Sequence, residues 1–173
     1  MRSDDTGAVE ARLVDARRAG WPSARLYALL DPLLPAHEGL APMLERGAGR
    51  VALFDQTVDA EVAEGGPWLV ELDATNAELV SGLLALGRDP QGVVWLISER
   101  NPPDLAQALR ERLNVRLRGI GVALLRYYDP TLLQGILALL SPSQRARFVA
   151  PAVQWLVERD GQVVQVAPEA SHA

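Results

Sequence analysis

Four aspartates follow directly after segments that have the pattern of β-strands, and they are the residues of this sequence best placed to do chemistry: Asp31, Asp55, Asp73 and Asp129. In open α/β sheets, ligands bind beyond the carboxyl ends of the strands. Several carboxylates at that edge could hold Mg²⁺ for phosphoryl chemistry, or act as nucleophile and base. The pattern therefore admits a metal-dependent hydrolase.

The same aspartates also have a structural interpretation. Asp31 and Asp129 each precede a proline, Pro32 and Pro130. Asp is a favoured N-cap, and Pro fits the first helical position because the N–H that it lacks would be unpaired there. No Lys, Ser or Thr completes a known phosphatase or nucleotide signature around them. The sequence favours capping, and we predict no catalytic, cofactor or metal site.

Composition removes several classes of chemistry. The 173 residues include no cysteine, which excludes disulfides, thiol catalysis and zinc–thiolate sites. All 17 basic residues are arginine, so there is no lysine for a Schiff base or a P-loop. The two histidines, His37 and His172, lie far apart in the sequence, which disfavours a histidine-rich metal site or a Ser-His-Asp triad.

Charge and hydropathy limit the partners. The net charge is −5 without long runs of one sign, which argues against a general nucleic-acid or membrane-surface binder. No stretch approaches 18 continuous apolar residues, and the amino-terminal residues are acidic rather than signal-like. We therefore expect a soluble, cytoplasmic protein.

One stretch organises the rest of the pattern. Residues 122–128 form a nearly continuous apolar run that is typical of a buried strand, and Asp129 and Pro130 then begin a helix with a wide apolar face. Arg126 is the only charge in the run. Because a buried or half-buried arginine needs a partner, we expect it to pair with a carboxylate such as Asp31 or Glu71.

The remaining elements predict an α/β layered fold, with a mixed central β-sheet flanked by helices and a C-terminal β-hairpin. The hairpin turns at Asp160-Gly161, a strong hairpin signal. We predict a single domain over residues 8–167, with disordered ends at 1–7 and 168–173. The other predicted strands span residues 25–30, 50–54, 68–72 and 93–98, and the clearest helices span 8–19, 76–86 and 101–113.

Two groups of residues are candidates for binding a partner. Arg110, Arg112, Arg116 and Arg118 form a local basic stripe; a solvated face is the usual explanation, and an acidic partner segment is the alternative. Of the four tryptophans, those in predicted strands, such as Trp68, are expected in the core. Trp155 is a weaker candidate for the core and could instead contact a partner.

Four phrases, in this order and spacing, resemble a known family: residues 26–31 (LYALLD), 66–72 (GPWLVEL), 125–130 (LRYYDP) followed by Leu132 and Leu133, and 141–144 (SPSQ) continuing through Phe148 to Trp155. The chain is similar to the adaptor-chaperone family of type VI secretion, known as Tap or TEC and long classified as a domain of unknown function. The resemblance extends over most of the chain.

The resemblance implies a non-enzymatic protein. It would hold a toxic effector in the bacterial cytoplasm and help to load it onto the spike protein VgrG or its PAAR tip. Partner contacts would then come from exposed apolar and arginine-rich surface, with Arg110, Arg112, Arg116, Arg118 and Trp155 as candidates. The family-motif residues would be structural: Tyr27, Asp31, Gly66, Pro67, Trp68, Arg126, Tyr128, Asp129 and Pro130.

Overall fold

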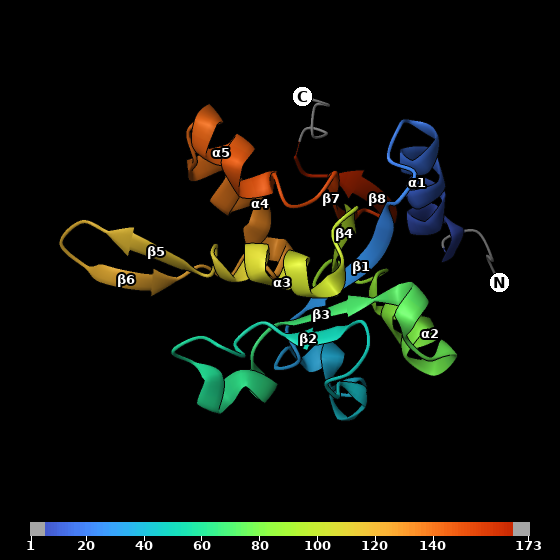
Figure 1. Cartoon of the computed structure of the whole chain (residues 1–173), viewed down its shortest axis with the longest axis horizontal. Helices are drawn as coiled ribbons and strands as arrows, with labels where there is room; N and C mark the ends of the chain where they lie inside the picture. The colour runs from blue at the N-terminus through green and yellow to red at the C-terminus, as the bar shows by residue number, and fades with distance from the viewer. Residues whose placement is uncertain (1–5, 168–173) are drawn as a thin grey trace.

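The computed structural model describes residues 6–167, and at their centre lies a six-stranded sheet (Figure 1). Its strand order is β2-β3-β1-β4-β7-β8, and every pairing is antiparallel. Three of the four inner strands, β1, β3 and β4, are almost entirely buried, which is why they have continuous apolar runs in the sequence. The bounds are Arg25–Leu30 for β1, Arg50–Ala52 for β2, Trp68–Glu71 for β3, Val94–Ser98 for β4, Gln154–Arg159 for β7 and Gln162–Gln165 for β8.

Helices cover this sheet. Helix α1 packs on β1, β4 and β8, and helix α3 packs on β2 and β3. The helices span Thr6–Arg18 (α1), Ala77–Leu86 (α2), Pro102–Arg110 (α3), Pro130–Leu139 (α4) and Pro142–Val149 (α5). Short 3₁₀ turns occupy Pro35–His37, Ala41–Met43, Ala60–Gly65 and Leu72–Ala74. The layered α/β fold and its C-terminal hairpin, β7–β8, are therefore confirmed.

The directions of the strands differ from the prediction of a mixed sheet. Strands β3 and β4, joined through α2, run in the same direction, as a strand–helix–strand unit predicts. However, β1 lies between them and pairs antiparallel with both. The two parallel strands are thus never neighbours, and this insertion of β1 makes the described sheet antiparallel throughout.

The predicted buried strand over residues 122–128 is wrong. Its first part lies in β6 (Gly121–Leu124), which pairs with β5 (Asn114–Leu117) in a separate two-stranded sheet that projects from the body (Figure 1). Val122 is 64% exposed. Gly119 and Gly121 have positive φ angles, which reverse the chain outward before the apolar run can enter the core.

The run returns to the core at its end. Tyr127 is fully buried, its hydroxyl donates to the carbonyl of Leu109 at 2.7 Å, and its ring packs edge-on against Tyr128, Phe148 and Trp155. Asp129 then caps α4, since its carboxylate accepts from the Thr131 amide, as the sequence predicts.

At the amino terminus, helix α1 includes Thr6 and Gly7, two residues of the stretch predicted to be disordered. Residues 1–5 and 168–173 lie outside the described residues, so the rest of that prediction stays a prediction. The buried apolar side chains form one core cluster from Val9 to Ala167.

Gly66, which lies just before β3, packs closely against the ring of Phe54. A Cβ built there would lie 2.4 Å from the ring of Phe54, whereas at Gly65 the nearest atom, in Leu33, is 3.7 Å away. Because Gly66→Ala overpacks a buried ring, we expect it to lower the free energy of unfolding by about 1–3 kcal/mol. Chemical denaturation measures the loss.

The matched control is Gly65→Ala, which we expect to be neutral or stabilising by up to about 1 kcal/mol. Equal stability of the two variants would contradict the close packing of Gly66 on Phe54.

Candidate functional site

The projecting hairpin, residues 114–124, is the most exposed apolar element of the described chain. Leu117, Ile120, Val122 and Leu124 are all exposed, and Ile120 at the tip is 79% accessible. Residues directly opposite each other in an antiparallel pair share a face. The register opposes Arg116 to Val122 and Asn114 to Leu124, so one face carries arginine and apolar side chains together.

A groove lies at the base of this face. Its volume is about 380 Å³, and Leu33, Phe54, Leu124 and Tyr128 contribute apolar wall. Arg126 lines it as well. Leu124 belongs to both the hairpin and the groove, so the two features are continuous. We call the hairpin face and the groove together the hairpin–groove surface.

An ion-pair cluster borders the groove. Nη2 of Arg126 lies 2.9 Å from Oδ2 of Asp31 and 3.7 Å from Oδ2 of Asp129. Partial burial acts to lower the pKa of Arg126, but the hydrogen bond and charge of Asp31 outweigh it and leave that pKa above its ordinary value. The expected partner Asp31 is thus in contact, whereas Glu71 pairs with Arg25 at 3.2 Å.

The side chain of Arg126 is 44% exposed, so this arginine is not enclosed in the core. The carboxylates are the buried members, since Asp31 is 5% and Asp129 8% exposed. Each also accepts from backbone: Asp31 from the Leu33 amide and Asp129 from the Thr131 amide. Arg126 therefore neutralises two capping aspartates from the solvent side.

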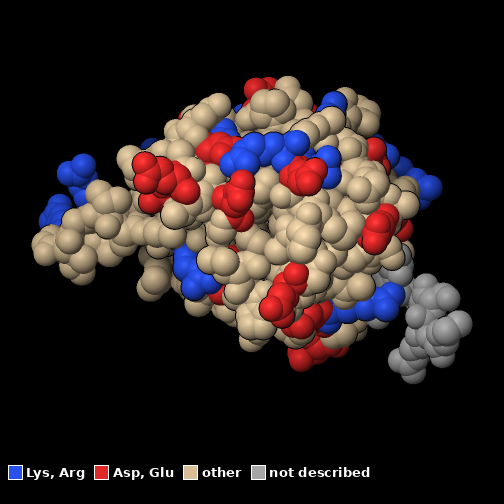
Figure 2. Space-filling model, turned by 90° about the horizontal axis from the view of Figure 1, so that it is seen from below, with Lys and Arg blue, Asp and Glu red and all other residues tan. Residues whose placement is uncertain are grey.

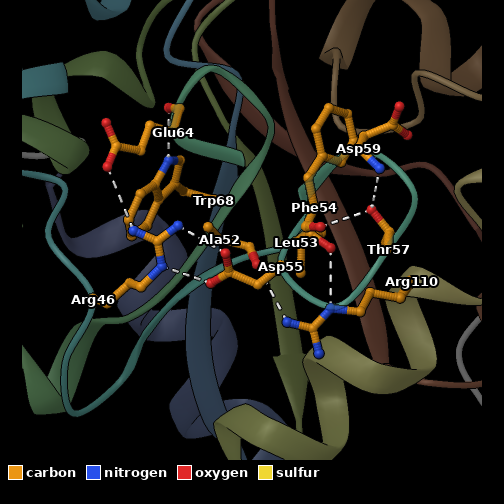
Figure 3. Close-up of polar contacts among 10 residues, drawn as sticks. All are labelled: Arg46, Ala52, Leu53, Phe54, Asp55, Thr57, Asp59, Glu64, Trp68 and Arg110. Carbon is orange, nitrogen blue, oxygen red and sulfur yellow. Dashed lines mark hydrogen bonds and ion pairs between the residues drawn. The ribbon is translucent and has the colours of Figure 1, made fainter. Parts of the chain in front are cut away.

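The other strand-end aspartates have separate partners. Asp55 accepts two hydrogen bonds from Arg46, at 2.8 and 2.7 Å, which lower the pKa of its carboxyl (Figure 3). Arg46 also lies 3.6 Å from Glu64 and 5.8 Å from the centroid of the Trp68 ring. Asp73 is exposed and lies 3.8 Å from Arg17.

These carboxylates do not converge. The end of β1 lies beside the start of β3. Because the two strands are antiparallel, Asp31 and Asp73 lie beyond opposite ends of this strand pair. Within residues 6–167, no three Asp, Glu or His side chains are grouped so that they could hold a metal ion. The described geometry assigns the strand-end aspartates to capping and ion pairs.

The basic stripe divides into two pairs. Arg110 donates to the carbonyls of Leu53 (3.0 Å) and Ala52 (3.2 Å), as Figure 3 shows. Arg112 donates to the carbonyls of Phe148 (2.7 Å), Arg147 (2.6 Å) and Ala108 (2.5 Å). Burial lowers the pKa of both guanidinium groups. Both side chains are thus tethered to the backbone of the chain itself, and their role in binding a partner stays a prediction.

Arg116 and Arg118 are different, because both are exposed on the hairpin. Neither makes an ion pair or a side-chain hydrogen bond with another described residue. They are the members of the stripe that remain available to a partner.

Trp155, the fifth candidate for partner binding, is a core residue. It is 1% exposed, and its indole N–H donates to the carbonyl of Val149 at 2.9 Å. Strand β7 lies between β4 and β8, and the rings of Tyr127 and Phe148 pack against the indole of Trp155. A partner therefore cannot reach Trp155 in this structure.

The residues that the resemblance marks as structural lie mostly inside the molecule. Tyr27 is fully buried and donates its hydroxyl to the carbonyl of Arg100 at 2.6 Å, and Trp68 donates to the carbonyl of Glu64 at 3.2 Å. Arg126 is the exposed member of this set, and its buried members are Tyr27, Asp31, Gly66, Pro67, Trp68, Tyr128, Asp129 and Pro130.

The sequence carries a signal for the hairpin, because residues 118–121 (RGIG), between two strand-like segments, could form a tight reversal or a bulge. Polar and apolar residues alternate from Asn114 to Arg118, a period typical of a half-exposed strand, and a Gly-Ile-Gly turn follows. The groove had no such signal, because its walls come from segments far apart in the chain.

Comparisons with known proteins place the chain in a family context. The model of a family described as "Domain of unknown function (DUF4123)" matches residues 26–147, well over half of the chain. No curated protein and no solved structure matches the sequence. Among the described helices, none has the length and hydrophobicity needed to cross a membrane.

Alanine variants of Arg112 and Arg116 test whether the first is a structural tether and the second an exposed residue. Arg112→Ala removes three hydrogen bonds from a charged donor, and we expect it to lower the free energy of unfolding by about 2 kcal/mol. Arg116→Ala, its matched control on the hairpin, should change stability by less than about 0.5 kcal/mol. Urea unfolding followed by circular dichroism distinguishes them, and equal losses would mean that Arg112 is not a tether.

Arg126 tests the ion-pair cluster. Arg126→Ala leaves the buried Asp31 without its cation, but solvent reaches the site, so we expect a loss of about 1–2 kcal/mol instead of the larger cost of breaking a fully buried pair. Arg118→Ala is the control without a partner and should be neutral. A melting temperature unchanged by Arg126→Ala would show that the pair does not stabilise the fold.

Proposed function

The chain belongs to the DUF4123 family, which is associated with type VI secretion, and from this premise we propose that it is a non-enzymatic adaptor chaperone. It binds a type VI effector in the bacterial cytoplasm and helps to load that effector onto the VgrG spike or its PAAR tip. The observation that carries the proposal to this chain is the hairpin–groove surface, a projecting apolar element that no described part of the chain covers.

Exposed apolar side chains support a binding role. Scattered single apolar residues are normal on a protein surface, whereas a contiguous group of them indicates an interaction site. Val122 and Leu124 lie on one hairpin face, and Leu33, which is 74% exposed, lies across the groove. An adaptor needs apolar anchors of this kind to hold its client.

The ion pairs favour the adaptor over a metal-dependent hydrolase. A hydrolase at the strand ends would need carboxylates that converge on one point with room for an ion. Instead, Asp31 and Asp129 share Arg126, and Asp55 is held by Arg46. The proposal therefore assigns these residues to stability and no catalytic step to the chain.

Co-purification tests the proposal. The tagged full chain is co-expressed with the product of each neighbouring reading frame, and we expect one of these proteins to be retained through affinity purification and size exclusion. Because a chaperone holds a client that otherwise aggregates, the soluble yield of that client should rise several-fold when the chain is present.

An unrelated tagged protein of similar size and charge serves as the control for retention. Failure to retain or solubilise any neighbouring product would contradict the adaptor role. A separate incubation with Mg²⁺ or Mn²⁺ addresses the hydrolase, which should gain thermal stability by mass action, whereas an adaptor should not.

A further inference from the structure

We propose that the hairpin–groove surface is the client site of this chain, and that its ligand is an extended segment with a large apolar anchor followed by carboxylates. This inference rests on the proposed function and deepens it by naming where the client binds and what chemistry is recognised. The anchor enters the groove, and the carboxylates meet Arg116 and Arg118 along the hairpin.

The hairpin face and the groove form one continuous surface. Val122 and Leu124 alternate along strand β6, so their side chains point to the same face of the hairpin. Leu124 and Arg126 line the groove, and Val122 continues the same face toward the hairpin tip. The groove, at about 380 Å³, has space for a large side chain. A ligand lying along this face would contact hairpin and groove at once.

The hairpin region is basic, although the chain as a whole is acidic. Residues 112–128 contain four arginines and no acidic residue, in a chain with a net charge of −5. Arg112 is occupied by backbone carbonyls, and Arg126 by Asp31 and Asp129. The uncompensated positive charge is therefore that of Arg116 and Arg118. On the face that Figure 2 shows, the protruding part of the molecule carries basic and no acidic side chains. An acidic segment complements it.

The hairpin also offers backbone. Strands β5 and β6 pair with each other and with no other strand between residues 6 and 167, so each has an outer edge. An extended segment can add to such an edge by main-chain hydrogen bonds, with its side chains reading the face of the sheet. This favours an extended ligand over a helical one.

Charge also argues against a second copy of this chain as the occupant. A two-fold pairing of hairpins would bring the positive charges of Arg116 and Arg118 from both copies into one interface, and the hairpin has no acidic residue to balance them. Like charges in an interface oppose association, whereas an acidic partner gains from the same residues.

Two pairs of substitutions test the proposal on the full chain with the client retained by co-purification. Arg116→Glu with Arg118→Glu should raise the Kd for the client by about tenfold or more at low salt. The increase should be smaller at high salt, because salt screens the new repulsion. Val122→Thr with Leu124→Thr should raise the Kd by about tenfold at both salt concentrations, since apolar burial is not screened.

Matched controls carry comparable polar or charge-reversing changes elsewhere, with Gln in place of Thr because the apolar control sites lie on helices. Arg18→Glu with Arg147→Glu introduces the same charge at exposed arginines away from the hairpin, and Val14→Gln with Leu139→Gln removes exposed apolar side chains of two helices. Both should bind the client as the parent does, and circular dichroism confirms the fold of every variant.

The outcomes separate the two proposals. If the parent retains the client and the hairpin variants bind equally well, the client site lies elsewhere and only this inference is overturned. If the parent retains no neighbouring product, the adaptor role and this inference both fall. If light scattering shows a parent dimer that Arg116→Glu with Arg118→Glu dissociates, the occupant is a second copy, which overturns the assignment of an acidic client segment.

Discussion

The projecting hairpin depends on how its two roots are fastened, because an isolated two-stranded hairpin is only marginally stable in water. Before the first strand, Arg112 donates to the carbonyl of Phe148, and Leu113 is 1% exposed. After the second strand, Tyr127 is buried against Phe148 and donates to the carbonyl of Leu109. Both roots therefore join α3 to the end of α5, and the hairpin extends from this junction as a held element.

Local signals allowed much of the fold to be predicted. The continuous apolar runs of β1 and β4, the caps Asn76 and Asn101, and the Asp-Gly turn of the last hairpin each act within a few residues, so composition and spacing suffice. Local signals could not predict the directions of the strands or which of residues 122–128 are buried. They depend on β1 lying between β3 and β4, and on Tyr127 being buried while Val122 is not, which are facts of tertiary packing.

The candidate site was predicted in part for the same reason. A carboxylate partner for Arg126, such as Asp31 or Glu71, follows from the need to neutralise a charge, and the structure shows Asp31 as that partner. The division of the four-arginine stripe could not be predicted, because sequence spacing does not reveal which guanidinium groups reach backbone carbonyls. Arg110 ends a helix packed on the sheet, within reach of Leu53, whereas Arg116 lies on a strand that, among the described strands, pairs only with its hairpin partner.

The contrast between the two sheets supports the assignment of the client site to the smaller one. The main sheet also has free edges, but its edge strands pack against helices, β2 against α3 and β8 against α1. Such packing leaves an added strand little apolar surface to cover. The hairpin has free edges and an exposed apolar face together, which is the combination that natural sheets avoid unless a partner covers it. Because its roots are held by the core, a client that adds to it need not first order the hairpin, and more of the contact energy remains available for binding.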